Sequence, residues 1–121
     1  MLVGFSLQNY KSFKETQSLS MVAAKHTRHK NHLKTLNNRN VLTAAAVYGA
    51  NASGKSNLCS AMTFSKRVME GGFSNMNLNK SYFRLDPDWT NKPGVFEYRI
   101  AVNSHEYEYG LAVENENSKE E

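Results

Sequence analysis

The sequence predicts an α/β fold in which antiparallel strands lie beside a single strand–loop–helix unit. Three observations lead to this prediction. Apolar residues alternate with polar ones near the N-terminus and again over residues 94–113, as in half-buried strands. A short apolar run over residues 41–48 ends at a glycine and is followed by a segment with helical periodicity. The stretch between them, residues 49–54, begins and ends with glycine.

Residues 1–24 are expected to form two strands joined by a turn. Val3, Phe5 and Leu7 alternate with polar or small residues, which predicts the first strand. Residues 9–14, Asn-Tyr-Lys-Ser-Phe-Lys, are typical of a polar turn, and Thr16–Val22 is the second predicted strand.

Residues 25–40 are polar and basic, and their weak apolar periodicity predicts a loop with at most one helical turn. Their three histidines, His26, His29 and His32, fit no standard zinc spacing and have no evident fourth ligand, so a metal site is disfavoured. Two interpretations stay open for this basic segment. It is either a solvated loop or a contact surface for DNA, RNA or a protein partner.

Residues 41–72 form the predicted strand–loop–helix unit. The run Val41–Tyr48 is rich in small and β-branched residues, which is typical of a strand buried on both faces. A helix is predicted from Gly54 to about Glu70, and Gly71-Gly72 provides its C-terminal stop. Its apolar face follows helical spacing and comprises Leu58, Ala61, Met62, Ser65, Val68 and Met69.

After an irregular stretch over residues 73–94, residues 94–113 are predicted to form an antiparallel hairpin. With Ser104-His105 at the tip, all the large apolar side chains of both arms face one side of the hairpin. The expected pairs are Val102 with Tyr107, Ile100 with Tyr109, Tyr98 with Leu111, and Phe96 with Val113.

The strongest motif is the octapeptide that joins the apolar run to the helix. Its residues, Gly49, Ala50, Asn51, Ala52, Ser53, Gly54, Lys55 and Ser56, match G-x-x-x-x-G-K-[ST] at every fixed position. In such a loop, backbone N–H groups and the helix N-terminus surround phosphate oxygens. Lys55 is expected to reach the β- and γ-phosphates, and the Ser56 hydroxyl to ligate Mg²⁺. The motif therefore predicts binding of a nucleoside triphosphate with Mg²⁺.

Extended to Asn57, the motif resembles the G-x-N-x-S-G-K-S-N of SMC, RecF and related ABC-type ATPase heads. Asn9-Tyr10-Lys11-Ser12-Phe13 is similar to the N-[FY]-[KR]-[ST]-F turn after their first strand. The resemblance is strongest to the ABC-type (AAA-family) ATPases of bacterial abortive-infection and other anti-phage systems. It covers residues 1–113. It implies the N-terminal lobe of a P-loop NTPase, with an antiparallel β-subdomain beside the P-loop strand and helix.

The resemblance also implies site residues, cofactors and partners. ATP and Mg²⁺ are the expected ligands, with Asn51 near the γ-phosphate and Lys11, Ser12 and Phe13 at the edge of the nucleotide site. Tyr10 or Phe13 either flanks the base or packs at the strand end, and packing is favoured. Such heads dimerise around two nucleotides and are often encoded beside a nuclease or another effector.

Several catalytic parts of the family are absent from this sequence. No apolar run ends in Asp-Glu as a Walker B strand does, and no Leu-Ser-Gly-Gly-type signature, switch histidine or Q-loop glutamine is assignable. We therefore expect residues 1–121 to be a partial head that binds ATP but hydrolyses almost none alone. The alternatives are a regulatory module that binds ATP without hydrolysing it, and a P-loop kinase or GTPase.

Composition agrees with a cytoplasmic protein that binds polyanions. Residues 1–69 carry ten Lys/Arg and one acid, whereas residues 70–121 carry five Lys/Arg and ten acids. The basic half suits nucleotide phosphates or nucleic acid. One cysteine, Cys59, excludes an internal disulfide, and the sequence shows neither a signal peptide nor a membrane-spanning run.

Overall fold

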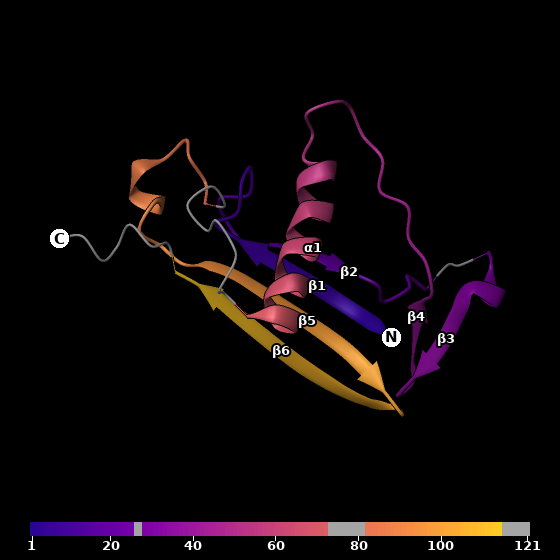
Figure 1. The fold of residues 1–121 in the computed structure, drawn as a ribbon. Coiled ribbons are helices and arrows are strands. Elements are labelled where there is room, and N and C mark those ends of the chain that lie inside the picture. The colour runs from indigo at the N-terminus through magenta and orange to yellow at the C-terminus, as the bar shows by residue number, and fades with distance from the viewer. Residues whose placement is uncertain (26–27, 73–81, 115–121) are drawn as a thin grey trace.

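The computed structural model describes residues 1–25, 28–72 and 82–114. In this part of the chain, four antiparallel strands form the main sheet in the order β2-β1-β5-β6, and α1 packs across one face of it (Figure 1). A two-stranded sheet, β3-β4, lies beside the end of the main sheet where β1 begins (Figure 1). The elements are β1 Leu2–Gln8, β2 Gln17–Ser20, β3 Leu33–Leu36, β4 Arg39–Leu42, α1 Lys55–Gly71, β5 Gly94–Val102 and β6 His105–Val113, with short 3₁₀ helices at Lys30–His32 and Pro87–Trp89.

The main core lies between α1 and the sheet. Alternation along β1 directs Phe5 and Leu7, each 2% exposed, towards the helix. They pack with Phe96 of β5 and Ala61 of α1. Burying each large apolar side chain contributes about 1.5–3 kcal/mol. The two strands predicted over residues 1–24 are confirmed as β1 and β2, which pair antiparallel.

Helix α1 begins and ends within one residue of the predicted bounds. Its buried residues, Ala61, Ser65 and Val68, recur at the expected helical spacing. Gly72 caps the C-terminus with a φ of 72°, a left-handed conformation that glycine adopts without strain. Met69, predicted on the apolar face, is instead 39% exposed because it lies in the last turn and belongs to neither core cluster.

The hairpin of β5 and β6 forms as predicted, but its register differs by two residues. Phe96 pairs with Leu111 and Tyr98 with Tyr109, because the turn is Asn103-Ser104 rather than Ser104-His105. Both turn residues have positive φ, 50° and 65°, as a two-residue turn that matches strand twist requires. A shift of two keeps the same side chains on the same face, so the predicted apolar face survives.

The basic segment 25–40 is not the loop that the sequence predicted. Beyond the short 3₁₀ helix, it contains β3 and the start of β4, which form a hairpin. The turn is Asn37-Asn38, with φ of 45° and 66°, and asparagine tolerates this left-handed region better than most residues. The prediction failed because the two strands are only four residues long and their outward side chains are polar.

A second cluster joins this hairpin to the main sheet. Its buried members are Val3, Met21, Leu36, Val41 and Ala101. A backbone hydrogen bond also joins the hairpin to the main sheet: the Leu42 N–H at the end of β4 donates to Met21 O, just after β2, at 2.7 Å. An ion pair between Arg39 and Glu106 links β4 to β6.

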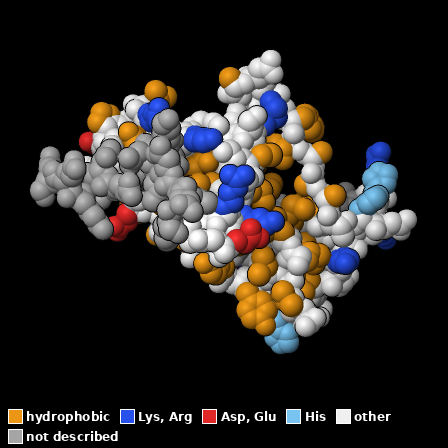
Figure 2. Space-filling model, viewed as in Figure 1, with side chains coloured by type: hydrophobic (Ala, Val, Ile, Leu, Met, Phe, Trp, Pro, Cys, Tyr) orange, Lys and Arg blue, Asp and Glu red, His pale blue; other side chains and the backbone are white. Residues whose placement is uncertain are grey.

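The predicted strand Val41–Tyr48 forms only at its start. Val41 and Leu42 belong to β4, whereas residues 44–49 adopt no regular structure and are exposed, Tyr48 to 92%. In Figure 2, hydrophobic side chains lie uncovered between α1 and this segment. The reason is non-local: a doubly buried strand needs a neighbour on each edge, and no strand of the described residues runs alongside 43–48.

Candidate nucleotide site

The loop that precedes α1 is held in a tight conformation by its own backbone. The Ser53 N–H donates to Ala50 O at 3.3 Å, and Ala52 and Gly54 have φ of 63° and 96°. At Gly49, a Cβ would lie only 3.0 Å from Ser53 Oγ, so a side chain there would displace that hydroxyl by a few tenths of an ångström. Ala52 holds a left-handed conformation that costs about 1–2 kcal/mol, and such strain is typical of binding loops.

Lys55 reaches back across the loop from the first position of α1. Its Nζ donates to Gly49 O at 2.7 Å and to Ala50 O at 2.6 Å, and it lies 3.3 Å from Ser53 Oγ. The ammonium group therefore points to the concave side of the loop. A phosphate that enters the loop would exchange these neutral carbonyl partners for charged oxygens, which form stronger hydrogen bonds with an ammonium.

The N-terminus of α1 is open and carries no acidic residue in its first turn. Its first helical hydrogen bond runs from the Leu58 N–H to Gly54 O, which leaves the N–H groups of residues 55–57 without a helical acceptor. These groups and the helix dipole attract anions. Ser56, at the second helical position, is exposed, and none of the described residues hydrogen-bonds its hydroxyl. Its position suits an Mg²⁺ that a nucleotide brings with it.

The turn after β1 lies directly against this helix. Asn57 Nδ2 donates to Ser12 Oγ at 2.8 Å, and Lys11 Nζ donates to Ser60 Oγ at 2.7 Å. Lys11 has a φ of 49°, so the turn itself is tightly wound. The structure thus brings two of the three predicted edge residues, Lys11 and Ser12, to the first two turns of α1.

The two aromatic residues of the turn pack rather than project into the site. Tyr10 is 3% exposed, its ring lies 5.4 Å from that of Phe96, and its hydroxyl is 3.0 Å from Ser60 Oγ. A base therefore cannot stack on Tyr10. Phe13 is half-buried against the main core, and its Cζ would be 3.6 Å from a Cβ on Gly54. Phe13 therefore packs between the main core and the loop at Gly54.

Residues 44–121, more than half of the chain, match the family described as "AAA domain, putative AbiEii toxin, Type IV TA system". The chain belongs to this family. Membership implies a P-loop ATPase domain, in agreement with the loop–helix geometry, and the resemblance inferred from the sequence is confirmed. No curated protein and no solved structure matches the chain.

Asn9, which precedes the residues matched by the AAA-domain family, forms more buried side-chain hydrogen bonds than its place in a predicted polar turn suggests. It is 1% exposed, and its Nδ2 donates to Trp89 O at 2.9 Å and to Lys92 O at 2.6 Å. Its Oδ1 accepts from the Phe83 N–H at 2.9 Å. Asn9 therefore fixes residues 83–93 against the turn. The only local signal is asparagine at a strand end, where its φ of 51° is tolerated.

An ion pair reinforces the same contact. Lys14 Nζ lies 2.7 Å from Asp86 Oδ2. The hydrogen bond from Lys14, followed by that from the Asp88 N–H, lowers the pKa of Asp86 below its ordinary value. The pKa of Lys14 is raised, chiefly by its hydrogen bond to Asp86. The turn after β1 and the segment around Asp86 are thus held together.

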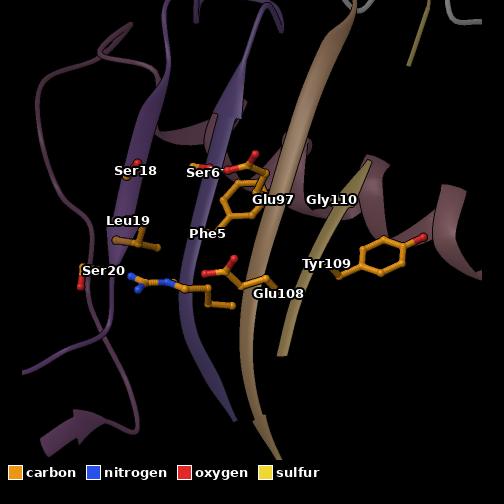
Figure 3. A pocket seen from close by; sticks show the side chains of 11 residues that line it. Phe5, Ser6, Ser18, Leu19, Ser20, Glu97, Glu108, Tyr109 and Gly110 are labelled. Atoms are coloured by element: carbon orange, nitrogen blue, oxygen red, sulfur yellow. Dashed lines mark hydrogen bonds between the residues drawn. The ribbon is translucent and has the colours of Figure 1, made fainter. Parts of the chain in front are cut away.

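A separate hollow of about 380 Å³ lies on the other face of the main sheet (Figure 3). Glu97, Arg99 and Glu108 line it, together with small residues such as Gly4 and Ser6. Ser6 Oγ donates to Glu97 Oε2 at 3.1 Å. With two carboxylates and no helix N-terminus, this hollow does not suit a triphosphate.

Two features, a side-chain metal cluster and a membrane-spanning helix, are absent from the part of the chain that the structure describes. Among residues 1–25, 28–72 and 82–114, no group of three or more His, Cys, Asp or Glu side chains is placed to hold a metal ion. In the same ranges, no helix has both the length and the apolar character needed to span a bilayer.

Proposed function

We propose that this AAA domain binds ATP with Mg²⁺ through residues 49–57 and acts as the N-terminal part of an ABC-type ATPase head. The observation that carries the proposal is the Lys55 ammonium, held within 2.7 Å of two loop carbonyls beside an acid-free helix N-terminus. Lysine, backbone N–H groups and the Ser56 hydroxyl together offer what a Mg²⁺–triphosphate requires. The chain's contribution is to bind and orient the phosphates, with Asn51 near the γ-phosphate.

Hydrolysis is expected to depend on residues outside this sequence. The chain offers no Walker B acid to support Mg²⁺ and no glutamate to orient the attacking water. We propose that the rest of an ATPase head supplies them, because a second copy of residues 1–121 would lack the same two acids. The exposed segment 44–48, which has the composition of a buried strand, is consistent with such a neighbour.

The biological role we propose is an ATPase in anti-phage defence, acting with a separately encoded nuclease or other effector. The family description, which names a toxin and a toxin–antitoxin system, supports this setting. In cells that carry the complete locus, Lys55→Ala should remove protection against phage. Full protection by that variant would contradict an ATP-driven role.

The binding proposal is tested by titrating the chain with a fluorescent ATP analogue, with and without Mg²⁺. Lys55→Ala should lower the affinity at least a hundredfold, since it removes a charge-assisted hydrogen bond to phosphate. Ser56→Ala should remove most of the difference between the titrations with and without Mg²⁺. Unchanged binding by Lys55→Ala would disprove the site.

Two alternative functions are a P-loop kinase or GTPase, which the fold disfavours, and a regulatory module that binds ATP without hydrolysing it, which an assay can distinguish. In a P-loop kinase or GTPase, the strand after the helix would lie parallel to the strand that leads into the loop. Here the next described strands after α1 are β5 and β6, which form an antiparallel hairpin with each other. A regulatory module would bind ATP with no turnover even when the complete head is assembled. A turnover assay on the complete protein separates that function from the ATPase.

A second candidate activity is contact with nucleic acid through the segment 25–40. It carries five Lys/Arg and no acid, and only Arg39 forms an ion pair with a described residue. Lys25, Arg28, Lys30 and Lys34 are exposed. A surface of unpaired cations favours a polyanion such as DNA or RNA.

A further inference from the structure

A cavity of about 460 Å³ opens beside the N-terminus of α1. One wall is formed by the turn after β1 and the first turn of α1, and the other by the segment that follows the undescribed residues 73–81. Its lining residues are Lys11, Ser12, Asn57, Tyr82, Phe83, Arg84 and Leu85. Its volume lies within the usual range for small-molecule sites, about 300–1,000 Å³.

The lining has two chemically different walls. Lys11, Ser12 and Asn57 offer hydrogen-bond donors and a positive charge, whereas Tyr82, Phe83 and Leu85 offer apolar and aromatic surface. Arg84 lies 5.9 Å from the centre of the Tyr82 ring, as in a cation–π contact. None of the described residues that line the cavity is acidic. Such a site suits a ligand with one flat, apolar part and one hydroxyl- or phosphate-bearing part.

The polar wall is continuous with the loop that would hold the phosphates. Asn57 lies two residues after Lys55 and donates to Ser12 Oγ. That oxygen is itself 3.6 Å from where a Cβ on Gly54 would lie. A ligand anchored by its phosphates at the start of α1 would therefore extend directly into the cavity.

The apolar wall is fixed before any ligand arrives. Asn9 holds the Phe83 N–H at 2.9 Å, and the Lys14–Asp86 pair fixes the chain three residues later. The Leu85 side chain is nevertheless 88% exposed, although it is large and apolar. A planar group bound here would cover the exposed Leu85 side chain, and little ordering of this wall would be needed because its backbone is already held.

From these observations we infer that the nucleoside part of the bound triphosphate occupies this cavity. The base lies against Tyr82 and Leu85, and the ribose lies towards Lys11, Ser12 and Asn57. The inference rests on the proposed function, because the phosphates must be held at residues 49–56. It assigns a binding role to residues 82–85, which no motif in the sequence identifies.

The test compares ATP with inorganic tripolyphosphate, both titrated with Mg²⁺ against the full chain by calorimetry. Tyr82→Ala and Leu85→Ser should each lower ATP affinity about tenfold, because each removes apolar surface that covers the base. Neither should change tripolyphosphate affinity. Leu85→Ser keeps the test decisive if Tyr82→Ala unfolds, since an 88% exposed side chain supports no core. Tyr107→Ala, at a 53% exposed tyrosine on β6, is the matched control.

The outcomes distinguish the nucleoside subsite from the proposed binding of phosphates at residues 49–56. If both variants bind ATP as the unmodified chain does, or if ATP binds no more tightly than tripolyphosphate, the nucleoside subsite is wrong while the phosphate site stands. If Lys55→Ala binds both ligands normally, the phosphate site is wrong, and the subsite is wrong with it. The inference is supported if Leu85→Ser, and Tyr82→Ala where it folds, lose ATP affinity while their tripolyphosphate affinity stays unchanged.

Discussion

Asn57 Nδ2 donates a 2.8 Å hydrogen bond to Ser12 Oγ and so joins the first turn of α1 to the turn after β1. The two residues are 45 positions apart in the sequence. This hydrogen bond is one of three between the same segments, because Tyr10 and Lys11 both meet Ser60 one helical turn later. Helix α1 is thus positioned by the turn after the N-terminal strand as well as by its own loop.

We predict that ATP binding depends on this hydrogen bond. Ser12→Ala and Asn57→Ala should each lower the affinity about three- to tenfold, since a neutral hydrogen bond contributes about 0.5–1.5 kcal/mol. The double variant should bind ATP about as the single variants do, because both changes break one interaction. Thr63→Ala is the control, since among the described residues its hydroxyl donates only to Cys59 O within α1. Fully additive effects in the double variant would show that the two residues act separately.

Asn9→Ala is predicted to destabilise the chain by about 3 kcal/mol. The change leaves the Trp89 and Lys92 carbonyls and the Phe83 N–H without their partner in a buried site. The free energy of unfolding, measured in urea, checks the value. Asn91→Ala, at an exposed position in the same segment, should change it by less than about 0.5 kcal/mol. A loss at Asn9 no larger than at Asn91 would contradict the role we assign to Asn9.

The Lys14–Asp86 pair predicts a limited pH dependence. Its geometry lowers the pKa of Asp86 from 3.8, so the stabilisation is present above that pH and is lost as the pH falls through the folded-state pKa. The pKa of Lys14 is raised from 10.5, so the same stabilisation is lost only as the pH rises beyond that value. Both side chains are solvent-accessible, and the effect should be small.

Asp86→Asn is the variant that isolates this ion pair, because an amide oxygen can still accept from the Asp88 N–H. Its urea midpoint should lie slightly below that of the unmodified chain between about pH 5 and pH 9. The difference should shrink below about pH 4 and in about 1 M salt, where charges are neutralised or screened. A difference that persists unchanged at about pH 3 would mean that something other than the charge is responsible.

Local patterns were enough to predict β1, α1 and the hairpin. Phe5 and Leu7 alternate, and Ala61, Ser65 and Val68 recur at helical spacing, so each element carries its own signal. The hairpin register was wrong because several tip pairs allow the same alternation. The turn at Asn103-Ser104 selects among them, and of these two residues only Asn103 belongs to a type that is enriched in the left-handed region.

Features that depend on distant residues were not predictable in this way. The short strands β3 and β4 are fixed by packing of Leu36 and Val41 on the end of the main sheet. The side-chain hydrogen bonds of Asn9 reach 74 to 84 positions along the chain. The motif located the phosphate loop, whereas the cavity wall at residues 82–85 has no sequence signal.

The basic hairpin of β3 and β4 allows a direct test of nucleic-acid binding. If residues 25–40 bind DNA or RNA, Lys30→Ala/Lys34→Ala should weaken binding at every sequence tested, because these lysines would meet phosphates rather than bases. The slope of log affinity against log salt concentration should fall by about one for each phosphate that is no longer neutralised. Fluorescence anisotropy over a series of salt concentrations provides both quantities.

The control for this experiment is Lys66→Ala/Arg67→Ala, which removes the same two positive charges from the exposed side of α1. If the hairpin is the binding surface, the control should keep nearly all of the affinity and the full salt slope. Equal losses in the two double variants would mean that net charge alone attracts nucleic acid. In that case the hairpin is a solvated surface, because an attraction set by net charge does not depend on where the cations lie.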